Sequence, residues 1–167
     1  MKYSNAQVFY HWFSFALIIL MVGTGLAYSY EWTESNVMQV HQIAGQILIV
    51  LLVLRITSRL RRRGFKWETS HALWERMLAG TVQLALYVLL ITYVGSGYVS
   101  ASAETTNALI APISLGFARS DLGEQILYLH YNLKWVLLGL VSLHVAGALK
   151  HAFIDRDVTL SHMNFHK

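Results

Sequence analysis

The chain contains no cysteine among its 167 residues, and only 13% of them are charged. The absence of cysteine excludes disulfides, thiolate metal sites, iron–sulfur clusters and covalently attached c-type haem. Any metal or cofactor must therefore be held by His, Met, carboxylates or backbone groups. A soluble domain usually has about twice this charged fraction, whereas 55% of the residues here are hydrophobic. The composition is typical of a membrane protein.

Four long stretches lack charged residues, apart from Lys134 in the last of them. Each is long enough to cross about 30 Å of hydrocarbon at about 1.5 Å per residue. The predicted spans lie at roughly residues 8–29, 38–58, 77–100 and 124–152 of a single membrane domain (1–167), with a loop at about 101–123. Four spans in so short a chain predict an all-α, four-helix transmembrane bundle with short connections. We expect the first to be a retained span and not a signal peptide, because its charge-free run is long, and we expect no internal repeat.

The positions of Lys and Arg predict the orientation of the bundle. All but Arg119 and Lys134 of the 13 Lys and Arg residues lie near the chain ends or around the connection between the second and third spans. Cytoplasmic segments carry an excess of these residues, so we expect both termini in the cytoplasm and the loop at about 101–123 outside. The basic residues border spans and form no separate basic domain, which argues against nucleic acid as a partner. We expect a multi-pass protein whose surroundings are membrane lipid.

Four histidines lie inside or at the edges of the predicted spans: His11, His41, His130 and His144. An ionisable residue in a span costs a few kcal/mol unless it is satisfied, so each is a candidate for function. Because the spans alternate in direction, His11 and His144 fall near the inner face, and His41 and His130 near the outer face. The 14 residues from His130 to His144 rise about 21 Å and complete four turns less about 40°, so both point to nearly the same side.

Two pairs of histidines at two depths predict two haem groups, each held between two imidazoles. A metal or proton transporter is the alternative, but it would need carboxylates beside the histidines, and the charge-free stretches contain none. Gly45, one turn after His41, is expected to leave room for the haem ring. Ordinary close packing of membrane helices would explain this glycine equally well.

Three segments resemble, in order, the bacterial cytochrome b561 family. KYSNAQVFYHWFSF has the N-terminal Tyr-Ser before His-Trp, and VHQIAGQILIVLLVLRITSRL has a histidine and glycine four apart and a terminal Arg-Leu. SLHVAGALKHAFIDRDVTLSHM resembles the last span and tail of the family. The resemblance covers nearly the whole chain. It implies two non-covalent b haems whose iron ligands are His11, His41, His130 and His144.

The resemblance also implies electron transfer at the bacterial inner membrane, between a periplasmic donor and ubiquinone or menaquinone. Some members oxidise superoxide and reduce ubiquinone, and others are cytochrome b subunits of nickel–iron hydrogenases or pair with soluble periplasmic cytochromes. We therefore expect a quinone-linked oxidoreductase whose donor is superoxide or a periplasmic redox protein. The alternative is a membrane anchor that only relays electrons for a larger oxidoreductase. The predicted outer side would suit a basic partner, because it carries the acidic residues Glu31, Glu34, Glu104, Asp121 and Glu124.

Three further residues are candidates for function. Arg55 directly follows an apolar run and is expected to pair with a haem propionate, although the excess of cytoplasmic Arg would also explain it. Lys134 lies one turn after His130 and could hold a propionate or an anionic substrate, or simply extend towards the headgroups. His151, seven residues and about 10.5 Å beyond His144, could bind a propionate or quinone, donate a proton to reduced quinone, or be a plain interfacial histidine. The third span has no histidine, in contrast to many relatives, so we expect it only to wall the haem pockets.

Overall fold

The computed structural model describes residues 3–32, 36–61, 72–103, 115–156 and 163–164. These residues form four long helices, a 3-10 turn and a π-helical turn. In chain order they are α1 (Asn5–Ser29), α2 (Asn36–Leu60), α3 (Leu73–Ala103), η1 (Gly116–Arg119), α4 (Asp121–Lys150) and η2 (His151–Asp155). All four α-helices are long and apolar enough to cross a membrane, which confirms the predicted all-α, four-helix transmembrane architecture. Most of the predicted outer loop lies outside the described residues.

The start of α1 shows how the sequence sets a helix boundary. Ser4 accepts a hydrogen bond from the backbone N–H of Gln7 at 3.3 Å, and the Gln7 side chain accepts one from the backbone N–H of Ser4 at 3.2 Å. This reciprocal capping box satisfies two N–H groups that the first turn would leave free. The helix that follows brings His11 into the bundle near its first turns.

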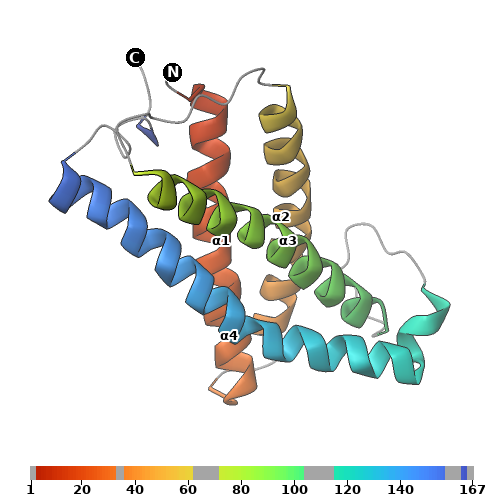
Figure 1. Cartoon of the computed structure of the whole chain (residues 1–167). Helices are drawn as coiled ribbons and strands as arrows, with labels where there is room; N and C mark the ends of the chain where they lie inside the picture. The colour runs from red at the N-terminus through yellow and green to blue at the C-terminus, as the bar shows by residue number, and fades with distance from the viewer. Residues whose placement is uncertain (1–2, 33–35, 62–71, 104–114, 157–162, 165–167) are drawn as a thin grey trace.

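The four helices pack as two antiparallel pairs. The helix α1 runs along α2, α3 runs along α4, and α2 joins the two pairs through its contact with α3. In Figure 1 the α3–α4 pair crosses the α1–α2 pair diagonally. The helices α1 and α4 make few direct backbone approaches, although their histidines face each other. The side chains of α1 and α4 therefore meet across a gap between the two backbones, as His11 and His144 do.

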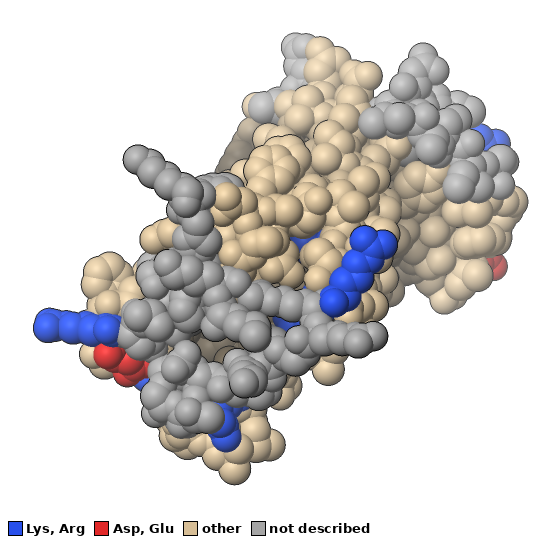
Figure 2. Space-filling view, turned by 90° about the horizontal axis from the view of Figure 1, so that it is seen from above, with Lys and Arg blue, Asp and Glu red and all other residues tan. Residues whose placement is uncertain are grey.

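One end of the bundle collects the start of α1, the end of α2, the start of α3 and the end of α4 (Figure 1). Gln7 of α1 donates to the carbonyl of Ser58 in α2 at 3.4 Å, and Lys150 of α4 forms a 2.8 Å ion pair with Glu75 of α3. Figure 2 looks onto this end and shows several Lys and Arg side chains projecting from a largely uncharged surface. This is the end that the positive-inside rule assigns to the cytoplasm.

Apolar residues fill the centre and also cover the outside of the bundle. Leu48 of α2 and Leu137 of α4 are almost fully buried in the cluster where the two pairs meet. Ile19, Val50 and Val88 are each more than half exposed, and at most 28% of the hydrophobic stretch of any of the four helices is buried. An apolar outer surface of this extent suits contact with lipid chains, which are as apolar as leucine.

Candidate functional site

Four histidines on three helices form two facing pairs. His11 of α1 faces His144 of α4, with ring centres 6.2 Å apart and ring planes at 59°. His41 of α2 faces His130 of α4, with ring centres 6.3 Å apart and ring planes at 88°. The structure brings together the same two pairs that depth along the spans predicts. We call them the inner pair (His11 and His144) and the outer pair (His41 and His130), after the membrane faces that the charge distribution predicts.

The spacing of each pair fits a single metal ion held between two imidazoles. A metal–imidazole nitrogen bond of about 2.0–2.1 Å places the metal about 3.1 Å from the ring centre, so two rings on opposite sides of one metal have centres about 6.2 Å apart. Both pairs have this separation. No group of three or more His, Asp or Glu that could hold a metal ion occurs among the residues that the structure describes. Two opposed nitrogen ligands, with the equatorial positions left to a macrocycle, are the arrangement that b haems use.

The outer pair is held by carbonyl and hydroxyl groups of neighbouring helices. The Nδ1 atom of His41 lies 2.9 Å from the carbonyl oxygen of Met21 and 3.2 Å from the hydroxyl of Thr24, both on α1. The Nδ1 atom of His130 lies 2.9 Å from the carbonyl oxygen of Tyr93 and 3.1 Å from the hydroxyl of Ser96, both on α3. A carbonyl can only accept, so Nδ1 carries the proton in both rings. Each Nε2 is therefore left free for a metal.

The helix α3 does more than wall the pockets, contrary to the expectation from its lack of histidine. The ring of Tyr93 also stacks on His130, with centres 4.3 Å apart and planes at 9°. Gly97 lies so close to that ring that an added Cβ would stand 2.8 Å from the Cε1 atom of His130. The third span therefore sets the position of a histidine that the fourth span carries.

The inner pair has different surroundings. The Nη2 atom of Arg55 lies 3.1 Å from Nδ1 of His11, and an arginine can only donate. The ring of Tyr87 lies near two guanidinium groups, with 5.8 Å from its centre to Cζ of Arg55 and the same distance to Cζ of Arg59. His144 is the most exposed of the four histidines, and none of the described residues forms a hydrogen bond with its ring. The structure thus brings Arg55 to the inner pair, next to His11.

Gly45 and Lys134 have neighbours other than the histidines. A Cβ at Gly45 would stand 3.2 Å from the terminal methyl of Met21, so this glycine makes room for the Met21 side chain. Met21 is also the residue whose backbone carbonyl accepts a hydrogen bond from His41. The ammonium of Lys134 lies 3.7 Å from the ring centre of Tyr131 and 5.5 Å from that of Trp135. Contact with aromatic rings is how a long cationic side chain near a membrane surface is held. The roles of Gly45 and Lys134 towards haem or substrate stay predictions.

His151 begins the π-helical turn η2 and belongs to a charged network at the inner end. Its Nδ1 atom lies 3.0 Å from Oδ2 of Asp155, and the same oxygen lies 2.7 Å from Nζ of Lys150. Lys150 also contacts Glu75 at 2.8 Å, which ties α4 to the start of α3. The turn ends at Arg156, whose φ of 52° is left-handed. Single π-helical turns occur often at functional sites because they redirect side chains.

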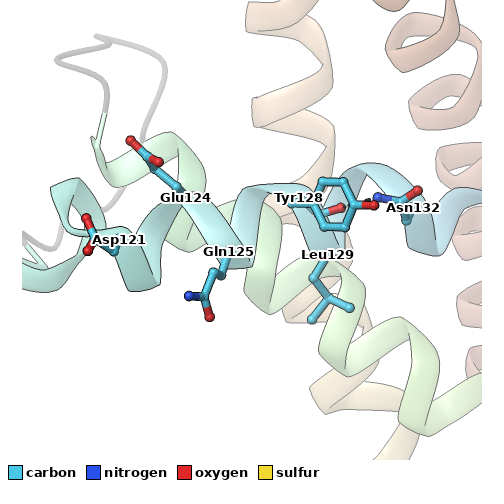
Figure 3. Close-up of a pocket in the computed structure, with 6 residues that line it drawn as sticks. All are labelled: Asp121, Glu124, Gln125, Tyr128, Leu129 and Asn132. Atoms are coloured by element: carbon cyan, nitrogen blue, oxygen red, sulfur yellow. Dashed lines mark hydrogen bonds between the residues drawn. The ribbon is translucent and has the colours of Figure 1, made fainter.

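An open groove of about 590 Å³ lies along the first turns of α4, and Figure 3 shows the side chains that line it. Its polar groups include two carboxylates at the start of the helix, and its lining extends past His130 to Asn132. The residues that line it are Asp121, Glu124, Gln125, Tyr128, Leu129 and Asn132. The groove therefore brings negative charge to the same half of the molecule as the outer pair.

The residues that hold the outer pair were missed by reasoning from histidine depth. The segments VGTG (22–25) and VGSG (94–97) repeat one pattern in the first and third spans. This short repeat was the available signal. Asp155 was missed as well, although it stands four residues after His151, the spacing at which side chains meet along a helix.

A family model described as prokaryotic cytochrome b561 matches residues 2–166. No curated protein sequence gives a significant match. Proteins of this family are membrane electron carriers that bind haem b, typically two haems with histidine ligands.

Proposed function

The chain belongs to the prokaryotic cytochrome b561 family, and from this premise we propose that it passes electrons between a periplasmic donor and quinone in the bacterial inner membrane. The donor is superoxide or a small redox protein, and the acceptor is ubiquinone or menaquinone. The proposal places both termini in the cytoplasm, as the distribution of Lys and Arg favours. The observation that carries it is the presence of two histidine pairs, each with the ring separation that one haem iron requires.

We assign the outer haem to His41 and His130 and the inner haem to His11 and His144. When bound, haem supplies reversible one-electron chemistry, which the protein tunes through its ligands and surroundings. The outer histidines present their Nε2 atoms because their Nδ1 atoms donate to backbone carbonyls. If Nε2 of His11 binds the inner haem, its Nδ1 atom also holds a hydrogen. Arg55 would then lose the nitrogen acceptor it has now and become available to a carboxylate such as a haem propionate.

We place quinone reduction at the inner end of the bundle, beside His151. Quinone needs two electrons and two protons to become quinol, so a proton donor must stand close to it. The contact of Nδ1 with Asp155 orients the His151 ring, in the manner of carboxylate–histidine pairs, and we assign this ring as the proton donor to quinone. Lys150 shares the same carboxylate oxygen and supports its position.

At the outer end we propose that Lys134 attracts an anionic donor, because it is the cation one turn from His130. Each superoxide anion gives up one electron and leaves as dioxygen. Two superoxide anions and two protons are therefore consumed for each quinone reduced to quinol. A site that attracts the anion raises the rate of encounter, and this gain falls as salt is added.

A second function is favoured by the acidic groove on α4 (Figure 3). Asp121 and Glu124 would attract a basic redox protein to the outer half of the molecule, and Tyr128 and Leu129 offer it an apolar contact. Aromatic residues flanked by charge are common at transient protein interfaces. In this case the chain relays electrons for a partner and has no substrate chemistry of its own at the outer face.

Rapid mixing of the purified protein in lipid nanodiscs with superoxide separates the two functions. A superoxide oxidase reduces its haems within the mixing experiment, and quinol accumulates without any added protein. A relay subunit stays oxidised under superoxide and is reduced only by a basic redox protein, with a rate that falls steeply with salt. Absence of the reduced haem absorption band in the purified protein would refute both.

A further inference from the structure

Two five-residue segments surround the outer histidines in the same way. They are Met21–Gly25 on α1 and Tyr93–Gly97 on α3, and after the first residue both read Val-Gly, then Thr or Ser, then Gly. In each segment the first residue offers its carbonyl to a histidine Nδ1 at 2.9 Å, and the hydroxyl three residues later lies 3.1–3.2 Å from the same nitrogen. The two segments therefore make the same contacts from equivalent places in the two helix pairs.

The glycines of the two segments also correspond. A Cβ at Gly25 would stand 3.2 Å from Cε1 of His41, and one at Gly97 would stand 2.8 Å from Cε1 of His130. A Cβ at either of the earlier glycines, Gly23 or Gly95, would meet nothing within 4 Å. Only the second glycine of each segment is required for the close approach of a histidine ring.

The hydroxyls of the two segments determine which ring nitrogen of each outer histidine holds the hydrogen. The hydroxyl of Thr24 donates to a carbonyl of its own helix, Leu20 at 2.7 Å or Met21 at 3.1 Å, and that of Ser96 donates to Tyr93 at 2.8 Å. Each hydroxyl already donates its hydrogen to a carbonyl, so it can only accept a hydrogen bond from the imidazole. A carbonyl and a hydroxyl oxygen both accept from one Nδ1–H, which fixes the tautomer and the plane of the ring.

We propose that Met21–Gly25 and Tyr93–Gly97 are matched histidine sockets, in which Thr24, Gly25, Ser96 and Gly97 position the two ligands of the outer haem. The inner pair has no such socket, because His11 faces an arginine donor and the ring of His144 has no hydrogen-bond partner among the described residues. The outer ligands are thus set by the protein before haem binds, and the inner ligands are not. This inference rests on the proposed haem-binding function of the two pairs.

The paired glycines provide the test. In detergent-purified holoprotein, Gly97→Ala and Gly25→Ala should each displace an outer ligand, so that haem per chain falls from two to one, or the ferric low-spin EPR signal of one haem shifts while the other is unchanged. The controls Gly95→Ala and Gly23→Ala make the same change two residues earlier and should keep both haems and both signals. If Gly97→Ala and Gly25→Ala match their controls in haem content and EPR, the sockets do not exist.

A milder variant covers the case in which Gly97→Ala fails to fold. Ser96→Ala removes only the hydroxyl and should increase, several-fold, the rate at which one haem passes to excess apomyoglobin. Ser100→Ala is the control, because the Ser100 hydroxyl donates to the backbone carbonyl of Ser96 one turn earlier and no described contact joins it to a histidine. Equal rates in the two variants would overturn the proposal. If the unmodified protein binds no haem, the proposed function fails; if it binds two haems that no socket variant affects, only the sockets fail.

Discussion

Replacing Arg55 with Met should lower the midpoint potential of the inner haem. Nη2 of Arg55 lies 3.1 Å from Nδ1 of His11, and a metal bound to Nε2 would lie about 4 Å beyond that nitrogen. A guanidinium that stays beside His11 when haem binds would therefore lie roughly 7–8 Å from the metal. At an effective dielectric constant of about 20, one charge at this distance contributes about 2 kcal/mol. A nearby cation favours the reduced form, since reduction removes a positive charge.

This energy corresponds to about 100 mV for a one-electron couple, and partial exposure of Arg55 would reduce it towards about half that value. Potentiometric titration of the visible bands should show one wave shifted down by this amount and the other unmoved. Arg59→Met is the matched control, because Arg59 lies at the same distance from the Tyr87 ring and is one turn further along α2. Equal potentials in the two variants would contradict the assignment of Arg55 to the inner haem.

Three further changes test other parts of the structure. His144→Ala should remove one haem and leave the second, as measured by pyridine haemochrome, and retention of both would refute the pairing. Asp155→Asn should slow quinone reduction roughly tenfold, because His151 loses the carboxylate that orients it. Reduction of haem by the outer donor, followed by stopped flow, should stay unchanged. Slowing of both steps would argue against a role in proton delivery. Gly123→Ala should lower the free energy of unfolding by roughly 1–3 kcal/mol, because the added Cβ would overlap a backbone carbonyl, whereas Gly116→Ala meets no neighbour within 4 Å and should leave the thermal unfolding temperature nearly unchanged.

The four helices were predictable because each depends on a local property, a long run of apolar residues. The pairing of the histidines was predictable for a related reason: antiparallel helices of known rise convert sequence position into depth. Depth along the spans was enough to predict the pairs His11–His144 and His41–His130 without knowledge of how the helices pack.

The groups around the histidines were not predictable by the same means. Which carbonyl faces Nδ1 of His41 depends on the rotation of α1 against α2, and rotation is set by side-chain packing between helices. The contact of Asp155 with His151 has the i,i+4 spacing of helical side-chain pairs, but the sequence does not predict that a π-helical turn continues the last helix as far as Asp155. The role of α3 was not predicted because Ser96 and Gly97 are not metal-ligating residue types. They only contact the histidine that another helix carries.

The sockets have a consequence for how the protein assembles. Each is made within one pair of consecutive helices, with 17–20 residues between the bonded partners around His41 and 34–37 around His130. Such local contacts form early and at little entropic cost, whereas the inner pair joins the first helix to the last and must wait for the two hairpins to meet. During synthesis, each outer ligand would thus be in its final pose as soon as its own hairpin is inserted. Docking of the hairpins would then complete both ligand pairs in one event.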